Sequence, residues 1–552
     1  MWQKLRNYQE TNYLRWNAFT AVGVLLIIIC GIKVSYNLDQ YMDLLFWDES
    51  LYLLRGYRMF PYIPRDWGPS YSLWYKILSL FITDKVALYY FNFKFTTILL
   101  SISFFLLLLS CGVQRVLAFI LGIFSLSAFL NLPVWPHVSH FCVIVLIAGI
   151  IVAKYQQTLV SKLVICSLAL MVCSYSRPEV FLAFFAVLAF TYLFFLLNIK
   201  QATKKDIILM LVLTGTFAFI YKFFKTPFNN GDSMRSIGVF LQHFALNYNT
   251  WYPSDAPFWL EFPSIIQKHF GGAITLKGII AANPELLERH FMSNTTLYFS
   301  QLGKMIISFF APVFTKTIHW LCLMVCIMLF ATYFSVAKKS KSKFRRLLAL
   351  LKSNIFTILV LMVFAFPSVI VCIYAYPRDH YLLLQVPFLL LLSALIISCV
   401  TVEIIKPIQK IIVVGAIWFF VMPVAEDFTY FNLFRKEESL ANLKTVNYLT
   451  KKFEKTTDSV RIFDVEGGLS YMLPNKFTEY NHYYLWRRDS IKMSDFILSH
   501  NIDIIYKTPT LTDLNSVKTD TILFDLLKNP EKYGYYNQKT GDFAPYLLLK
   551  KR

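Results

Sequence analysis

Residues 86–111 read VALYYFNFKFTTILLSISFFLLLLSC, and Lys94 is the only charged residue among them. A helix needs about 20 apolar residues to cross the hydrocarbon core of a bilayer. Because a bilayer offers no water to backbone polar groups, such a run favours a helix, which satisfies those groups internally. The stretch therefore predicts a membrane-spanning helix, with Lys94 near its outer end so that the ammonium reaches the interface.

The composition of the whole chain is also that of a membrane protein. Of its 552 residues, 57% are hydrophobic and 16% are charged, and the mean hydropathy is +0.51. Soluble globular proteins carry roughly 25% charged residues. The 54 Lys and Arg residues exceed the 33 Asp and Glu residues, which gives a formal net charge of +21. In so apolar a chain, the first question is whether a membrane sorts these basic residues.

Ten further apolar runs make the chain polytopic. The third, fourth and fifth runs of the full set are short for a span, and broken or shifted helices are the alternative there. All eleven runs are predicted as spans, and they lie at residues 17–35, 86–111, 116–132, 138–153, 160–175, 180–199, 206–224, 312–335, 354–375, 382–402 and 408–424.

The distribution of basic residues predicts the orientation of these spans. With the N-terminus in the cytoplasm, eighteen Lys and Arg residues and only three acids fall on the cytoplasmic side. Arg177 and Arg378 are the only Lys or Arg residues in the short outer turns, which lie at 133–137, 176–179 and 376–381. Most of the positive charge is therefore an orientation signal, and no nucleic-acid partner is expected. An odd number of spans then places the C-terminus outside.

Three long segments share the predicted outer face, at residues 36–85, 225–303 and 425–552. In the middle segment aromatic residues alternate with Pro before a helical pattern, which predicts helices on the membrane surface. The expected fold class is an all-α polytopic module of about 11 transmembrane helices over residues 1–424, followed by a small extracytoplasmic α/β domain over residues 425–552.

The last segment has the pattern of an α/β domain. Its expected elements are a strand at 459–465, a turn at Gly467-Gly468, a helix at 493–499, a strand at 502–506 and a final strand at 545–549.

The first outer loop places two adjacent carboxylates, Asp48 and Glu49, among aromatic residues. Such surroundings can raise or split the pKa values of two acids, which a general base working near neutral pH requires. The alternative is that these acids cap the helix predicted over residues 50–57, because acids favour a helix N-terminus. The two roles are compatible.

Other ionisable residues gather where the spans meet the predicted outer surface. Such residues are costly near a membrane and mark functional sites by default. Because Arg suits bidentate contact with phosphate, Arg177 and Arg378 form a candidate clamp for a lipid phosphate. The alternative is interfacial anchoring, or an ion pair with a neighbouring acid. The residues concerned are His137, His140, Arg177, Glu179, Arg378, Asp379 and His380.

The cysteines and histidines show no metal-binding pattern. All nine cysteines lie in or beside apolar runs, which argues against a secreted disulfide scaffold or a zinc module. His137 and His140 have a spacing that could share a metal, but a hydrogen-bonded pair is the commoner arrangement. Asp48 and Glu49 alone offer too few ligands. No cofactor is therefore assigned, and a divalent metal ion stays an open alternative.

Several motifs in order along the chain resemble the GT-C superfamily of integral-membrane glycosyltransferases. The branch that holds the lipid A aminoarabinose transferase and the protein O-mannosyltransferases is the most similar. The matching stretches are Asp48-Glu49-x-x-Tyr52 through Arg55-Gly56, Asp66-x-Gly68-Pro69, Ser176-Arg177-Pro178-Glu179, Asn283-Pro284-Glu285 with His290 and Asn294, Pro377-Arg378 to Tyr381, Ile502 to Ile505, and Asn529 to Gly534.

This resemblance implies an activity and roles for particular residues. A sugar would pass from a polyprenyl-phosphate donor to an acceptor hydroxyl on the extracytoplasmic face, in one inverting displacement. Asp48 would be the base, Glu49 would orient it or the acceptor, and Arg177 and Arg378 would neutralise the leaving phosphate. Further donor-binding candidates are Arg58, Arg65 and His380. Other candidate site residues are Asp66, Tyr52, His137 and Glu179.

Two other functions stay open at this point. One is a transporter or flippase for a lipid-linked anion, although transporters are expected to show repeated halves and broken helices near mid-membrane. The other is a ligase or polymerase that uses a lipid-linked oligosaccharide. The acceptor is a lipid, a glycan or a protein, and no motif selects one of them. The expected location is a bacterial cytoplasmic membrane, in contact with its lipids.

Overall fold

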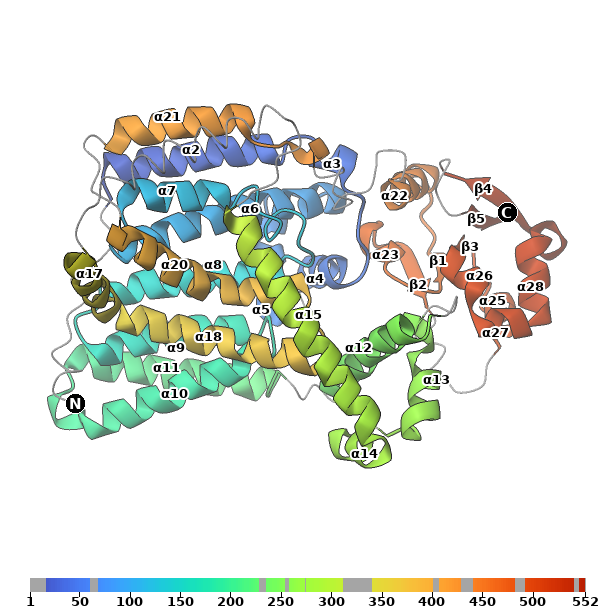
Figure 1. Cartoon of the computed structure of the whole chain (residues 1–552). Coiled ribbons are helices and arrows are strands. Elements are labelled where there is room, and N and C mark those ends of the chain that lie inside the picture. The colour runs from blue at the N-terminus through green and yellow to red at the C-terminus, as the bar shows by residue number, and fades with distance from the viewer. Residues whose placement is uncertain are drawn as a thin grey trace.

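A computed structural model gives the fold of the chain (Figure 1). It describes residues 16–59, 68–227, 235–253, 258–273, 275–310, 340–400, 407–427, 440–481, 492–540 and 546–551. These residues form a bundle of long helices, with a small domain that contains a β-sheet at one end of it.

Apolar helices lying side by side make up the bundle (Figure 1). They are α2 (Ala18–Val34), α6 (Lys85–Ser110), α7 (Arg115–Phe124), α8 (Val138–Lys154), α9 (Leu159–Ser174), α10 (Val180–Leu197), α11 (Lys204–Phe224), α18 (Ile355–Tyr374), α20 (Val386–Val400) and α21 (Pro407–Val421). The short elements between them are α3 (Leu38–Tyr41), η1 (Ile199–Gln201), α17 (Ser340–Ser353), α19 (Asp379–Leu382) and η2 (Leu383–Gln385).

Six helices of the described residues are long and apolar enough to cross a membrane. Four other predicted spans are apolar helices of only 10–17 residues, among them α7 and α21. At 1.5 Å per residue even the longest of these reaches about 25 Å, short of a hydrocarbon core of about 30 Å. The predicted span at 312–335 lies outside the described residues. The expectation of about eleven spans is therefore not confirmed.

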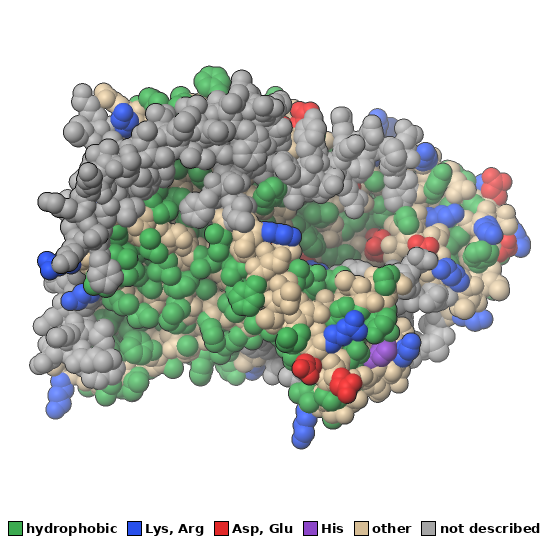
Figure 2. All heavy atoms as spheres, viewed as in Figure 1, with side chains coloured by type: hydrophobic (Ala, Val, Ile, Leu, Met, Phe, Trp, Pro, Cys, Tyr) green, Lys and Arg blue, Asp and Glu red, His purple; other side chains and the backbone are tan. Residues whose placement is uncertain are grey.

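The outer surface of the bundle is apolar, as a lipid-facing surface must be. Leu211 and Phe219 of α11 are 67% and 63% exposed. Figure 2 shows hydrophobic side chains covering much of the described bundle surface on one face, while charged side chains lie toward its ends and on the small domain. Soluble monomers rarely expose so extended an apolar surface. It is consistent with a membrane protein.

The predicted outer segments lie at the same end of the bundle, next to the small domain, while α17 lies at the opposite end (Figure 1). The first of these segments forms α4 (Asp48–Tyr57) and α5 (Pro69–Ser79). The middle segment forms α12 (Arg235–Trp251), α13 (Phe258–Phe270), α14 (Leu276–Ala282) and the long α15 (Pro284–Phe310), which packs against α18.

The small domain contains a five-stranded mixed sheet in the order β2-β1-β3-β5-β4. Strand β1 is parallel to β2 and β3, and β5 is antiparallel to β3 and β4. The strands are β1 (Val460–Asp464), β2 (Phe477–Tyr480), β3 (Ile504–Lys507), β4 (Tyr535–Lys539) and β5 (Tyr546–Lys550). The helical elements are α22 (Ala441–Lys452), α23 (Leu469–Met472), α25 (Met493–Ser499), α26 (Pro509–Asp513), α27 (Asn515–Thr519), α28 (Thr521–Lys528) and η5 (Pro530–Tyr533).

Each element predicted for this domain is confirmed to within two residues. The buried apolar runs give β1, β3 and β5, and the predicted helix coincides with α25. The sequence pattern missed β2 and β4, which lie at the two edges of the sheet. An edge strand buries fewer side chains, so its apolar pattern is weaker: Tyr536, Gln538 and Lys539 all keep some exposure.

Polar contacts join the small domain to the first outer segment. Both carboxylate oxygens of Asp43 accept backbone N–H groups at the start of α22, from Asn442 at 3.1 Å and from Leu443 at 2.9 Å. The ammonium of Lys85 donates to the carbonyl oxygen of Leu473. These contacts hold the sheet domain against the loop that carries the two adjacent carboxylates.

Candidate functional site

Helix α4 begins directly at Asp48, so the two acids of the first loop occupy its first two positions. The residue before the helix is Trp47, and no side chain there makes a capping hydrogen bond. The expected cap is therefore corrected: Asp48 and Glu49 lie in the first turn, where a negative charge favours the helix dipole. Asp48 is half-buried, whereas Glu49 is fully buried.

Four donors surround the Glu49 carboxylate. Its Oε1 accepts from the hydroxyls of Tyr71 at 2.6 Å and Tyr75 at 2.5 Å, and from the amide of Asn92 at 3.0 Å. Its Oε2 accepts the backbone N–H of His137 at 2.7 Å. Glu49 thus ties α4 to α5, to α6 and to the start of α8.

Burial raises the pKa of Glu49 to about 7, although the hydrogen bonds from Tyr71, Tyr75 and His137 act in the opposite direction. Burial outweighs these bonds because taking a carboxylate out of water penalises its charged form. With its oxygens occupied by protein donors, Glu49 holds the start of α4 in place and leaves Asp48 as the acid nearer to solvent.

The first loop meets the turn at residues 176–179 through Gly68. A Cβ on Gly68, whose φ is +60°, would lie 2.6 Å from a ring carbon of Tyr52 and 3.1 Å from the carbonyl oxygen of Ser176. A hydrogen bond also joins the two segments directly: the N–H of Ser70 donates to the carbonyl oxygen of Tyr175 at 3.3 Å. Two motifs more than a hundred residues apart in sequence are therefore in contact.

Arg177 and Glu179 form a buried ion pair in that turn. The Nε of Arg177 donates to the Glu179 carboxylate at 2.8 Å, and the two side chains are 9% and 10% exposed. Burial opposes the charge of Arg177, but Glu179, Tyr381 and Tyr52 raise its pKa above the ordinary value. The guanidinium therefore stays charged inside the protein.

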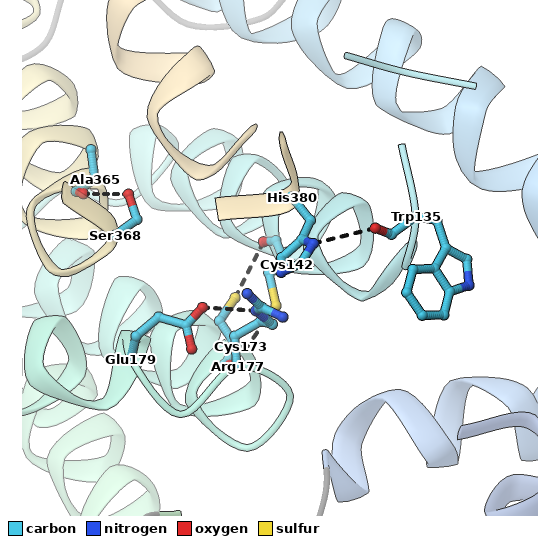
Figure 3. A network of polar contacts seen from close by, with 8 residues as sticks. All are labelled: Trp135, Cys142, Cys173, Arg177, Glu179, Ala365, Ser368 and His380. Carbon is cyan, nitrogen blue, oxygen red and sulfur yellow. Dashed lines mark hydrogen bonds and ion pairs between the residues drawn. The ribbon is translucent and has the colours of Figure 1, made fainter. Parts of the chain in front are cut away.

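The guanidinium of Arg177 has unused hydrogen-bonding capacity. Its carbon lies 4.6 Å from the centroid of the Tyr381 ring, a cation–π arrangement. Its Nη2 is buried and has no hydrogen-bond partner among the described residues. Figure 3 shows Arg177 directed toward Glu179, with His380, Cys142 and Cys173 gathered around it. A buried guanidinium with a free N–H group is suited to an anionic ligand.

Tyr381 connects the separate predicted residues. It is buried and lies within electrostatic range of Asp48, Arg177, Glu179 and Arg378. Tyr381 ends one of the sequence motifs but is not among the site residues predicted from the sequence. The signal that could have found it is its position one residue after His380, in a turn that already contained an arginine.

His380 and Arg378 belong to the same region. His380 is buried, and its Nδ1 lies 3.2 Å from the carbonyl oxygen of Trp135. Arg378 is half-buried, precedes α19 and lies within electrostatic range of His243 and His380. The two arginines predicted as a phosphate clamp thus both lie within electrostatic range of one buried tyrosine, Tyr381.

His137 contributes its backbone to Glu49 and its ring to a histidine pair. The rings of His137 and His140 stack with centroids 3.9 Å apart, and His137 Nδ1 lies 2.6 Å from the Thr96 hydroxyl. The second nitrogen of each ring has no partner in the described structure, so this pair is only partly satisfied. Across the described ranges, no three His, Cys, Asp or Glu side chains gather closely enough to hold a metal ion.

One other predicted residue falls elsewhere, and two are not described. Arg58 is exposed, and its guanidinium donates to the side-chain oxygen of Asn475 at 3.3 Å, in the contact with the sheet domain. Arg65 and Asp66 lie outside the described residues. The structure therefore brings together Asp48, Glu49, Tyr52, His137, Arg177, Glu179, Arg378 and His380, but it turns Arg58 toward the sheet domain.

A polar network behind the turn at residues 376–381 supports it. The Asn294 side-chain amide donates to the carbonyls of Ile373 and Ala375, each at 2.9 Å. Asn247 donates to Asn294 at 2.8 Å and approaches His290 Nδ1 at 2.9 Å. Free carbonyls at a helix C-terminus need such donors. The network fixes the end of α18, from which the Arg378 turn leaves.

The comparisons with known proteins give no match: no family model, no curated protein and no solved structure resembles this chain.

Proposed function

We propose that this protein is a membrane glycosyltransferase that moves a sugar from a polyprenyl-phosphate donor to an acceptor hydroxyl on the extracytoplasmic face. The observation that carries the proposal is the grouping around Tyr381. A half-buried carboxylate, Asp48, and a buried guanidinium with a free N–H group, that of Arg177, lie in one region at one end of an apolar bundle. A base and an anion site close to each other are what transfer from a lipid phosphate requires.

The reaction would use these groups in a single displacement. The Asp48 carboxylate accepts the proton of the acceptor hydroxyl while the acceptor oxygen bonds to the anomeric carbon. The bond from that carbon to the phosphate oxygen breaks at the same time, and the phosphate leaves with the electron pair. Arg177 and Arg378 stabilise its negative charge, because preorganised donors act most strongly where charge develops.

The division of roles between the two acids follows from their environments. Glu49 has four protein donors on its carboxylate and no exposed surface. A base must come within about 3 Å of the proton that it removes, which favours the half-buried Asp48. Glu49 then positions the first turn of α4, from which Asp48 projects.

The test uses cells from which the gene has been deleted. Such cells, supplied with the wild-type protein or with Asp48→Asn, are compared by mass analysis of their outer-surface glycans. We expect a glycan modification with the wild type and none with Asp48→Asn, at equal protein levels in the membrane. Asp39→Asn is the matched control, because Asp39 is an exposed acid of the same loop that pairs with Lys94 at 3.8 Å. Full modification with Asp48→Asn would show that Asp48 is not the base.

A binding experiment separates this function from its rivals. Purified protein in nanodiscs is titrated with polyprenyl monophosphate and with polyprenyl pyrophosphate. Preference for the monophosphate, weakened by Arg177→Ala and by Arg378→Ala, supports the proposal. Preference for the pyrophosphate supports an oligosaccharide ligase. Movement of the carrier across the bilayer without any change in the glycans supports a flippase.

A further inference from the structure

The backbone immediately before Asp48 has an unusual conformation. Trp47 has φ +67° and ψ −168°, a region that essentially only glycine occupies. Asp48 follows with φ +21°. Conformations of this kind persist only where the surrounding structure holds them. The question is which part of the protein holds the Trp47–Asp48 corner.

The sheet domain supplies the contact. A Cβ on Gly468 would lie 2.6 Å from the Cβ of Phe46 and 3.1 Å from the backbone nitrogen of Trp47. A Cβ on Gly467 would lie 2.8 Å from the Cζ2 of the Trp47 indole. The Gly467-Gly468 turn therefore packs against the corner so closely that neither position has room for a methyl group.

Two carboxylates, of which Asp464 is buried and Glu479 is half-buried, hold the turn itself in shape. Glu479 Oε1 accepts the N–H of Gly468, and Oε2 accepts the N–H of Ser470, both at 2.7 Å. Asp464 accepts the N–H of Leu469 at 3.3 Å. These acids belong to β1 and β2, so the sheet fixes the turn, and the turn meets the corner.

Further contacts keep the two parts together around this point. The Trp47 ring meets Tyr471 of α23 edge to face, with centroids 6.1 Å apart. Asp43, four residues before Trp47, accepts the N–H groups at the start of α22. The sheet domain thus contacts both the indole ring of Trp47 and the backbone of the corner.

We propose that the Gly467-Gly468 turn positions Asp48, so that the sheet domain sets the geometry of the base although it contributes no group to the reaction. Gly467 and Gly468 are positioning residues in this view. The link to catalysis rests on the proposed function, while the contact that holds the corner does not. A displacement of about 1 Å is enough to cost on the order of 10²-fold in rate at a positioned catalytic group.

The two glycines differ in what a substitution would disturb. Gly468→Ala places its methyl group against backbone and Cβ atoms, which cannot rotate away. Gly467→Ala meets the Trp47 indole at 2.8 Å, and also the side chains of Asn481 at 2.9 Å and Glu479 at 3.1 Å. Trp47→Phe would relieve only the clash with the indole, because its ring is smaller. Gly534 provides the matched control: it has φ +79° in the same domain, but beyond its chain neighbours no atom of the described residues lies within 4 Å of its added Cβ.

The experiment uses the full chain in nanodiscs and measures hydrogen exchange in peptides covering residues 43–55. We expect Gly468→Ala to speed exchange there roughly tenfold or more, as local opening becomes easier, and Gly534→Ala to leave it unchanged. Polyprenyl monophosphate affinity should be unchanged in Gly468→Ala, while glycan modification in cells falls on the order of 10²-fold. Gly467→Ala should show a smaller change that Trp47→Phe reverses in part, because the contacts with Asn481 and Glu479 remain.

The outcomes are separable. Unchanged exchange in Gly468→Ala overturns the positioning contact, whatever the activity. Faster exchange with full glycan modification overturns the link between the contact and Asp48. If Gly468→Ala does not fold, a Gly467→Ala effect that Trp47→Phe does not reduce at all overturns the proposal. If wild-type protein modifies no glycan, the proposed function fails, and the exchange measurement still decides the contact.

Discussion

The guanidinium carbon of Arg177 lies 4.6 Å from the centre of the Tyr381 ring, and Arg177 Nε is bound to Glu179 at 2.8 Å. The charge is therefore held from two directions by groups on α19 and in the turn before α10. Within the described structure the Nη2 nitrogen has no hydrogen-bond partner, so it can donate to an acceptor on a ligand. This arrangement makes Tyr381 a support for the proposed phosphate site, and it can be tested without disturbing the ion pair.

Replacing Tyr381 by Leu should weaken donor binding, whereas Tyr381→Phe should not. A desolvated cation–π contact contributes about 2 kcal/mol, which corresponds to roughly 30-fold in affinity. Phe keeps the ring and loses only the hydroxyl. Polyprenyl monophosphate titration of both variants in nanodiscs gives the comparison. Equal affinities for the Leu and Phe variants would show that the ring does not support Arg177.

Removing Arg177 alone should affect both stability and donor binding. Arg177→Met leaves the Glu179 carboxylate buried and unpaired, which costs about 3–5 kcal/mol. The double variant Arg177→Met/Glu179→Gln should recover most of the thermal stability, because no buried charge is left. Its affinity for the lipid monophosphate should stay weak, by on the order of 10- to 100-fold, since the charge-assisted bond is gone. If the double variant recovers lipid monophosphate affinity as well as stability, Arg177 is not part of the phosphate site.

Glu49 should make stability depend on pH in a defined window. Burial raises its pKa from 4.5 to about 7 in the folded protein, so folding takes up a proton between these values. The resulting stabilisation, about 3 kcal/mol, is complete below pH 4.5, declines as the pH rises and is lost above pH 7.

The measurement is thermal unfolding of wild-type and Glu49→Gln protein between pH 4.5 and pH 8. The wild type should lose stability relative to the variant across this window, because Gln cannot titrate. Taking the difference between the two proteins removes the contribution of other groups. Parallel curves would mean that Glu49 titrates in the folded protein as it does in the unfolded chain.

The network behind the Arg378 turn should be sensitive to Asn294. Asn294→Ala leaves carbonyls at the end of α18 without their donor, at about 1–3 kcal/mol for a buried unpaired group. Thermal unfolding measures this loss directly. Thr296→Ala is the control, since its exposed hydroxyl bonds only within its own helix, to Met292. An Asn294→Ala protein as stable as the control would contradict the assigned role.

The Thr296→Ala variant, compared with the wild type, also settles whether Asn294 carries a glycan. Asn294 begins the sequence Asn294-Thr295-Thr296, an acceptor pattern for N-glycosylation. Its side chain is fully buried and bonded. Expressed in a host that glycosylates secreted chains, folded wild-type protein and Thr296→Ala should have matching masses apart from the substitution. An added glycan on the wild type would contradict the buried placement.

Long and strongly apolar patterns were predictable from sequence. The run at residues 86–111 gives α6, and the apolar runs after residue 459 give β1 and β3, because burial on a regular element produces a periodic pattern. The grouping of Asp48 with Arg177 was also foreseeable, since Asp48 lies in a predicted outer loop and Arg177 in a predicted outer turn. Order along the chain and a shared face were enough to bring these residues into one region.

Other features depend on tertiary contacts that leave no local signal. The four donors around Glu49 come from α5, α6 and the start of α8, and no spacing in the sequence relates them. Tyr381 gains its role only because Arg177 lies over its ring. The length of short apolar helices such as α7 was overestimated, because hydropathy continues past the residue at which the helix ends.

The central claim is that Asp48 is the base of a sugar transfer, and outer-surface glycans of gene-deleted cells test it most directly. Cells receive the wild type, Asp48→Asn or Asp39→Asn at matched membrane levels, and their glycans are compared by mass. A single sugar increment present with the wild type and Asp39→Asn, and absent with Asp48→Asn, is the predicted result. The same increment with Asp48→Asn as with the wild type would contradict the account.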